Sequence, residues 1–395
     1  MLKTDRIHSL DSLRAIMMFL VIVSHSALTY SITYFGHDWE IKDPLTTDVI
    51  CDAIVILIQP FIMPLFFMVS GFFGALLFYE NSPIQMLKNR ILRLVFPFVV
   101  FLFILYPITE FSFSYTSAVF ARLENPFELA LKPFSKLSNF IPDSTEHLWF
   151  LYYLLLITGT VVVLALLLKK TPKFTHLITF IFEWIIQKPF VRILFFSFLI
   201  ILILATFNRS MEIGSFTLRP DLHTFIFYLF FYFLGWILFK SKNYLDIFMR
   251  YDWVSLVMGI ILNVIRGLII KNYNLVPNSP TPLLILLSSF SICFCIFGII
   301  GLFIRYSSYY SSKLGYISQA SYWVYLIHMP ITAILPAFIW KFAVPAVAKF
   351  LIVFSVTTMI CFLSYHYLVR RTFIGIFLNG RKNKKIFQTL HTKPI

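Results

Sequence analysis

The chain has 395 residues, of which 59% are hydrophobic and only 13% are charged, with a mean hydropathy of +0.83. A water-soluble domain of this size cannot hide so much apolar surface, so the composition excludes a soluble globular protein and indicates one that crosses a membrane several times. The formal net charge of +15 is compatible with a nucleic-acid partner, but its distribution between apolar segments, described below, argues against one.

Windows of about 20 apolar residues predict ten transmembrane helices. In chain order the expected spans are Ser12–Tyr34, Asp52–Phe78, Ile91–Glu110, Leu148–Leu168, Phe190–Phe207, Leu222–Phe239, Trp253–Ile270, Leu283–Phe303, Ala320–Lys341 and Pro345–Val369. An even number of spans places both termini on the same side of the membrane. We therefore expect an all-α polytopic membrane protein, with one transmembrane domain over residues 1–370 and a basic cytosolic tail over residues 371–395.

The basic residues in the loops predict the orientation. Of the 33 Lys and Arg residues, 22 lie in the two termini and the loops on their side, and nine lie on the opposite side. Cytoplasmic loops carry the excess of Lys and Arg, so both termini are expected in the cytosol. This distribution is a topology signal, and we predict a lipid bilayer and no nucleic acid as the partner of these charges.

The first span carries two ionisable residues, Arg14 and His25, in the stretch LDSLRAIMMFLVIVSH. Eleven residues correspond to nearly whole helical turns, so both side chains share one helix face, roughly 16 Å apart along the axis. Charged groups inside a membrane are costly and mark functional sites. Asp11 precedes Arg14 by three residues and can pair with it; we place Asp11 with His25 in the catalytic set. The structural alternatives are snorkelling for Arg14 and a helix–helix hydrogen bond for His25.

The third span opens with Arg90 and Arg93 in KNRILRLVFPF. From spacing alone they are ordinary positive-inside anchors. Together with Arg14 they would instead form a cationic cluster at the cytosolic mouth, suited to phosphate groups. The preceding segment PLFFMVSGFFGALLF brings Ser70 and two glycines into a span. Such small residues permit either close helix contact or the approach of a ligand chain.

Three further residues near span ends are candidates for substrate contact. His147 and Trp149 begin the fourth span in HLWFLYYL, and His328 lies in the ninth span in SYWVYLIHMPI. An interfacial aromatic belt also explains Trp149, and helix packing also explains His328. Two longer segments lie between spans: residues 111–147, which could cover the outer mouth, and residues 171–189, which predict an interfacial amphipathic helix. No zinc signature, nucleotide loop or serine-hydrolase elbow occurs, so we expect no metal site.

Several of these segments together resemble a known family. LDSLRAIMMFLVIVSH resembles the Arg-x10-His first-helix motif of membrane acyltransferase family 3, and FFMVSGFFGALLF followed by NRILRL resembles its Ser-Gly-Phe-Phe segment with paired basic residues. HLWFLYYLL and ISQASYWVYLIHMPI look most like the glucan-biosynthesis protein C branch. The resemblance runs through nearly all ten spans. It implies acyl transfer from cytosolic acyl-CoA to a sugar hydroxyl outside and, in that branch, succinylation of periplasmic glucans at the bacterial inner membrane.

The resemblance assigns His25 to the family's essential histidine, Arg14 to its arginine, and Arg90 with Arg93 to its basic pair. We expect helices around a central acyl-transfer tunnel, with these arginines and Ser70 at the donor and His25 as general base. The donor would be succinyl-CoA or acetyl-CoA and the acceptor a glucan or another glycan, with no permanently bound cofactor. Rival interpretations are a transporter or flippase for an anionic or lipid-linked solute, which also uses intramembrane His and Arg, and a polysaccharide-export scaffold.

Overall fold

The structure is a computed structural model that describes residues 3–35, 39–80, 82–212, 214–273, 275–276, 278–309 and 311–379. Within these ranges the chain is mostly helical, and the β interaction present is an isolated bridge between Ser144 and Thr217. Residues 380–395, which make up most of the expected basic tail, lie outside the described residues.

Ten helical segments of the described chain are long and apolar enough to cross a membrane, which confirms the all-α polytopic prediction. The longer helices are α1 (Lys3–Leu28), α2 (Val49–Glu80), α4 (Phe96–Phe120), α6 (Trp149–Leu168), α7 (Pro172–Ile186), α8 (Pro189–Thr206), α9 (Leu222–Lys240), α10 (Asp252–Asn272), α11 (Pro282–Tyr306), α12 (Ser312–Ile334) and α14 (Ala346–Ser364). The shorter helices are α3 (Pro83–Arg90), α5 (Pro126–Leu131), α13 (Pro336–Ile339) and α15 (Phe373–Asn379), with π-helical turns at Ile91–Val95 and Tyr365–Val369 and a 3₁₀ helix at Lys242–Met249.

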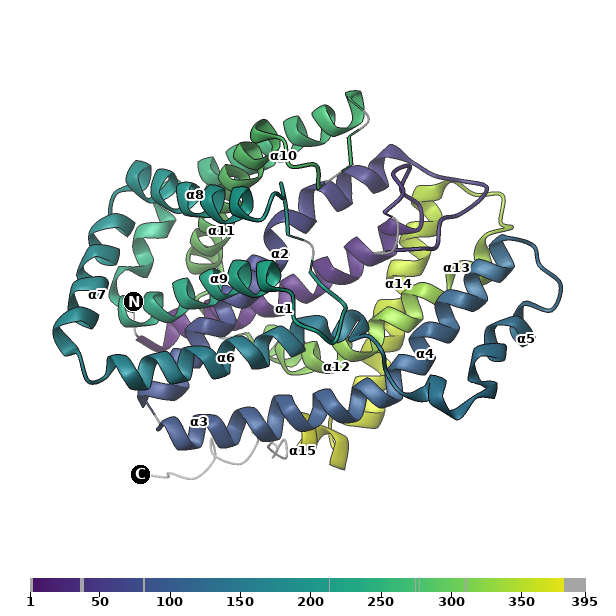
Figure 1. Cartoon of the computed structure of the whole chain (residues 1–395), viewed down its shortest axis with the longest axis horizontal. Coiled ribbons are helices and arrows are strands. Elements are labelled where there is room, and N and C mark those ends of the chain that lie inside the picture. The colour runs from purple at the N-terminus through teal and green to yellow at the C-terminus, as the bar shows by residue number, and fades with distance from the viewer. Residues whose placement is uncertain are drawn as a thin grey trace, which may run out of the picture.

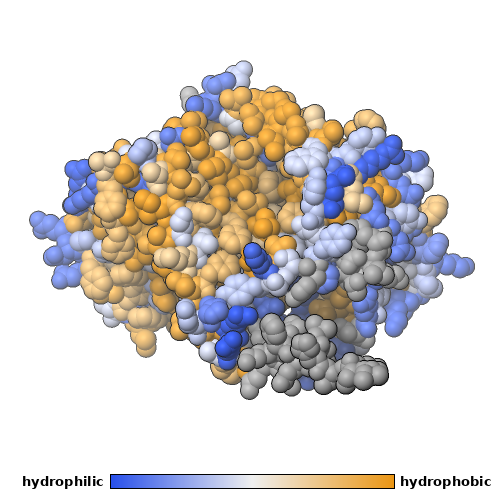
Figure 2. Space-filling model, turned by 180° about the vertical axis from the view of Figure 1, so that it is seen from behind, coloured by the Kyte–Doolittle hydropathy of each residue, from blue (hydrophilic) through white to orange (hydrophobic). Residues whose placement is uncertain are grey.

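Several of the long helices run roughly along the long axis of the molecule, with α7 at one end and α5 at the other (Figure 1). The face in Figure 2 carries a broad apolar region between hydrophilic residues at the two ends of that axis. This is the surface expected of a bundle whose sides contact lipid tails and whose ends contact water.

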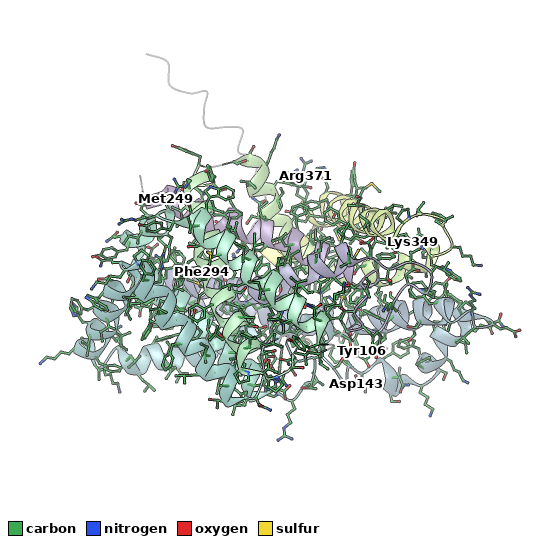
Figure 3. All side chains as sticks on the ribbon, turned by 90° about the horizontal axis from the view of Figure 1, so that it is seen from above. Tyr106, Asp143, Met249, Phe294, Lys349 and Arg371 are labelled. Carbon is green, nitrogen blue, oxygen red and sulfur yellow. The ribbon has the colours of Figure 1, made fainter. Side chains whose placement is uncertain are left out.

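The third span is longer than the sequence predicted. It extends over Pro83–Phe120 rather than ending at Glu110, because the residues after Glu110 contain no helix breaker and continue the backbone hydrogen bonds. Beyond Phe120 the chain forms α5 and short 3₁₀ turns before α6. The Tyr106 hydroxyl of α4 donates a hydrogen bond to Asp143 at 2.9 Å (Figure 3), so this segment is tied back to the bundle. The predicted amphipathic helix over residues 171–189 is confirmed as α7.

Helix α2 crosses the bundle and packs against α9 without intervening side chains. A Cβ at Gly71 of α2 would overlap the backbone oxygen of Tyr232 in α9, and a Cβ at Gly235 of α9 would overlap the backbone oxygen of Met68. The sequence left two uses open for the small residues of this span, close helix contact and the approach of a ligand chain. In the structure, Gly71 makes a close helix contact. The neighbouring Ser70 lies on a different side of α2 and lines a cavity.

Candidate active site

Helix α1 places Arg14 and His25 in two adjoining cavities. The arginine cavity, of about 370 Å³, is lined by Arg14. The histidine cavity, of about 80 Å³, is lined by His25. Val21, Met63 and Tyr325 line both. Arg14 and His25 therefore line neighbouring cavities inside the bundle, and His25 borders its cavity together with residues of other helices.

The arginine cavity gathers the cationic groups that the sequence singled out. Arg90, Arg93 and Ser70 line it together with Arg14. The π-helical turn Ile91–Val95 joins α3 to α4 at this point, and such turns are frequent at functional sites. No residue pattern in this part of the sequence indicated the turn, since π-helical geometry has no strong local sequence signature.

The guanidinium of Arg14 has a hydroxyl partner on α12 and an acidic partner on its own helix. Its Nη2 donates a hydrogen bond to the Ser318 hydroxyl of α12 at 2.9 Å and lies 3.3 Å from an Asp11 carboxylate oxygen. Two buried nitrogens of Arg90, Nε and Nη2, have no hydrogen-bond partner among the described residues. A buried donor without a partner is costly, and a ligand that brings acceptor oxygens would satisfy both atoms. The arginine cavity is therefore chemically suited to an anionic group.

Asp11 does not lie beside His25. It pairs with Arg14, and it lines neither cavity. Fourteen helical residues separate it from His25, which is roughly 21 Å at 1.5 Å per residue. The structure therefore brings Asp11 to Arg14 and not to His25, and its place in the catalytic set stays a prediction.

The histidine cavity contains three imidazoles that the sequence had placed on different spans. Nδ1 of His25 lies 3.0 Å from Nε2 of His328, and the two rings stack with centroids 5.1 Å apart. His147 meets His328 edge to face at 5.8 Å. Trp149 also lines the cavity. The three residues predicted for substrate contact are thus brought together around His25.

The backbone partners of His328 determine which ring nitrogens carry protons. Nδ1 of His328 lies 2.7 Å from the Tyr325 carbonyl oxygen. A carbonyl only accepts, so Nδ1 donates, and Nε2 of neutral His328 is left as an acceptor. His25 must then donate from Nδ1 to His328. Its Nε2 accepts no hydrogen bond from the described residues and keeps its lone pair, so His25 is held in one tautomer.

His147 uses its two ring nitrogens in the opposite way to His328. Its Nε2 donates to the Leu326 carbonyl oxygen at 2.8 Å, and its buried Nδ1 has no hydrogen-bond partner among the described side chains and backbone. The Tyr325 hydroxyl donates to the His147 carbonyl at 2.6 Å and fixes this turn. His147 therefore presents a second lone pair.

The segment after α1 covers the histidine cavity with Trp39. Its ring stacks on His25 with centroids 5.6 Å apart, and its Nε1 donates to the Thr29 hydroxyl at 2.9 Å. The segment is held by a fully buried ion pair in which Lys349 donates to Asp43 at 2.9 Å. Trp39 gave no sequence signal, because its position depends on this long-range pair.

Glu212 is a further residue that the sequence analysis missed. It lies in the loop between α8 and α9, its side chain is 2% exposed, and it lines the histidine cavity. Burial raises the pKa of its carboxyl to about 7, against the opposing effects of a hydrogen bond from Thr224 and the nearby charge of Arg209. A single carboxylate in a loop is no motif, so only the fold identifies Glu212.

These features define a polytopic membrane protein with a cluster of buried imidazoles and a separate cationic cavity. A family model described as an acyltransferase domain matches residues 7–366. The chain therefore belongs to acyltransferase family 3, and it is a membrane acyltransferase. The match does not distinguish branches of the family, so the glucan-biosynthesis branch stays a prediction. The comparisons with curated proteins and with solved structures found no match.

Proposed function

We propose that the protein transfers an acyl group from acyl-CoA, bound in the arginine cavity, to a glycan hydroxyl in the histidine cavity, with His25 as general base. The observation that carries this proposal is the free Nε2 lone pair of His25 in a cavity that shares three lining residues with the arginine cavity. Donor and acceptor enter from opposite sides, and the acyl group crosses only the short distance between the two cavities.

The arginine cavity fits the charged end of coenzyme A. Arg14, Arg90 and Arg93 supply guanidinium groups that bind phosphate oxygens with charge-assisted hydrogen bonds. Its volume of about 370 Å³ lies within the range usual for small-molecule sites. The pantetheine arm then passes Val21, Met63 and Tyr325, beside Ser70, and presents the thioester to His25.

The tautomer of His25 determines which of its ring nitrogens takes the proton in the proposed reaction. Nε2 of His25 takes the proton of the acceptor hydroxyl while the hydroxyl oxygen attacks the acyl carbon. The carbon–sulfur bond then breaks, and the thiolate of coenzyme A leaves with the electron pair and takes the proton from the His25 imidazolium. The products are an O-acyl ester and free coenzyme A. The hydrogen bond from Nδ1 of His25 to His328 stabilises the imidazolium and orients its ring.

We propose the acyl group, the acceptor and the membrane orientation from the sequence. The acyl group that we propose is succinyl or acetyl, and the acceptor is a periplasmic glucan or another surface glycan. The excess of basic residues on the side of both termini supports a cytosolic position for them, and hence entry of acyl-CoA from the cytosol of a bacterial cell at its inner membrane.

The experiment is acyl transfer by the purified full chain in lipid nanodiscs. The protein is incubated with radiolabelled acetyl-CoA or succinyl-CoA and methyl β-glucoside, and labelled ester is measured. We expect His25→Ala to abolish ester formation, since the base contributes about 10²–10⁴-fold to such reactions. The matched control is His176→Ala on the exposed face of α7, which should retain full activity.

Two outcomes contradict the proposal. Full activity of His25→Ala would exclude His25 as the base. Absence of any labelled ester with the wild-type chain, combined with uptake of a labelled anionic solute into proteoliposomes, would favour the transporter instead.

A further inference from the structure

The histidine cavity presents several hydrogen-bond acceptors and leaves the matching donors to a ligand. Nε2 of His25 and Nδ1 of His147 both carry lone pairs that accept no hydrogen bond from the described residues. The third acceptor is Glu212, which is a carboxylate above its pKa of about 7. A site of this kind is complementary to a ligand rich in donors, such as a polyhydroxyl compound, and not to a second anion.

The contacts of Glu212 leave one of its oxygens available. Oε1 accepts hydrogen bonds from the Gly214 backbone N–H at 3.2 Å and from the Thr224 hydroxyl at 2.9 Å. Oε2 lies 3.9 Å from Nη1 of Arg209 and 3.6 Å from Nε2 of His223, and both distances are too long for a hydrogen bond. The carboxylate is thus held in place by Oε1, while Oε2 has Arg209 and His223 as ion-pair partners and accepts no hydrogen bond from the described residues.

The loop that carries Glu212 is built against an aromatic wall of the cavity. Gly214 has a φ of +127°, and a Cβ there would come within 2.7 Å of the Trp149 indole. The glycine therefore lets the loop approach Trp149 and direct its N–H to Glu212. Trp39 forms another part of the lining. Indole faces bind the C–H face of a sugar ring, while carboxylates and imidazoles bind its hydroxyl edge.

We propose that Glu212 is the residue that selects the acceptor, by accepting a hydrogen bond from a second hydroxyl beside the one that His25 deprotonates. This inference rests on the proposed acyl transfer and adds to it the residue that distinguishes a sugar unit, with its neighbouring hydroxyls, from a simple alcohol. His147 accepts from the same hydroxyl edge through Nδ1. Gln59 and Ser24, which also line the cavity, supply neutral polar groups at its border.

The test compares two acceptors in the nanodisc assay with labelled acetyl-CoA. Methyl β-glucoside offers neighbouring hydroxyls, whereas 1-propanol offers a single one. Glu212→Gln keeps an oxygen for Gly214 and Thr224 but places an amide nitrogen, which only donates, at the open position. We expect the ratio of kcat/KM for glucoside over propanol to fall at least ten-fold, through KM for the glucoside rather than kcat. The matched control is Glu128→Gln, an exposed carboxylate in α5, which should leave this ratio unchanged.

The outcomes separate the inference from the proposed function. If the wild-type chain esterifies neither alcohol, the proposed function fails. If it esterifies both and Glu212→Gln leaves the ratio unchanged, or lowers kcat for both equally, the inference about Glu212 is overturned while acyl transfer stands.

A second measurement needs no substitution and so does not depend on the folding of the variant. Monodeoxy derivatives of methyl β-glucoside are compared as acceptors for the wild-type chain. At least one derivative should show a ten-fold higher KM, because it lacks the hydroxyl that Glu212 binds. Equal KM values for all derivatives would overturn the inference.

Discussion

Substitution of His328 by leucine tests whether the two stacked imidazoles act as one catalytic unit. Nδ1 of His25 donates to Nε2 of His328 at 3.0 Å, and His328 is fully buried. When His25 takes up the acceptor proton, this becomes a hydrogen bond from a cation, which contributes about 1.5–3 kcal/mol. At about 1.4 kcal/mol per ten-fold change in rate, His328→Leu should lower kcat by about ten- to hundred-fold.

Steady-state kinetics separate this effect from a loss of structure. His328 does not line the arginine cavity, so KM for acyl-CoA should change by less than about two-fold. His328→Gln retains a side-chain oxygen that can accept from His25 and should recover part of the lost rate. In the background of His25→Ala, the His328→Leu change should cost nothing further, since residues that act as a unit are not additive.

A different pattern would refute the reasoning. If His328→Leu changed kcat less than two-fold, or if it lowered the residual rate of His25→Ala as much as that of the wild-type chain, His328 would not act through His25. The tautomer deduced from the Tyr325 carbonyl would then have no catalytic consequence.

Three other perturbations test the donor site, the buried carboxylate and the helix packing. Arg14→Ala should raise KM for acyl-CoA about ten-fold or more, by loss of a charge-assisted hydrogen bond, whereas exposed Arg122→Ala should not; equal values would remove Arg14 from the donor site. Because the pKa of Glu212 is raised from 4.5 to about 7 in the folded protein, the folded state binds the extra proton, so the free energy of unfolding should fall by up to about 3 kcal/mol as pH rises through this window. Thermal unfolding between pH 4.5 and 8 should show a shallower fall for Glu212→Gln, and parallel curves would contradict this. Gly71→Ala places a methyl group against the backbone of α9 and should destabilise the protein by about 1–3 kcal/mol, whereas Gly159→Ala, with nothing within 4 Å, should not; equal melting temperatures would show that the helices shift freely.

The sequence by itself determined the architecture and the helix face of the site. Ten apolar windows predict ten spans because the bilayer requires a fixed length of apolar helix whatever its neighbours are, and the described part of the chain has ten such helices. Arg14 and His25 were predictable as a pair for a similar reason, since eleven residues of a regular helix fix their relative direction without any tertiary contact. Helix ends were less predictable, as the extension of α4 beyond Glu110 shows, because no breaker marks them.

Only the tertiary structure decided which polar groups meet. His147 and His328 lie 181 residues apart in the chain, and their convergence on His25 depends on how α1, the 3₁₀ turn before α6, and α12 pack. The same holds for Glu212, which carries no motif and enters the cavity because a glycine lets its loop approach Trp149. Periodicity describes directions within one helix, whereas the register between helices comes from side-chain packing across the bundle. The histidine that we propose as the proton acceptor was therefore visible in the sequence, and its contacts with the other two imidazoles were not.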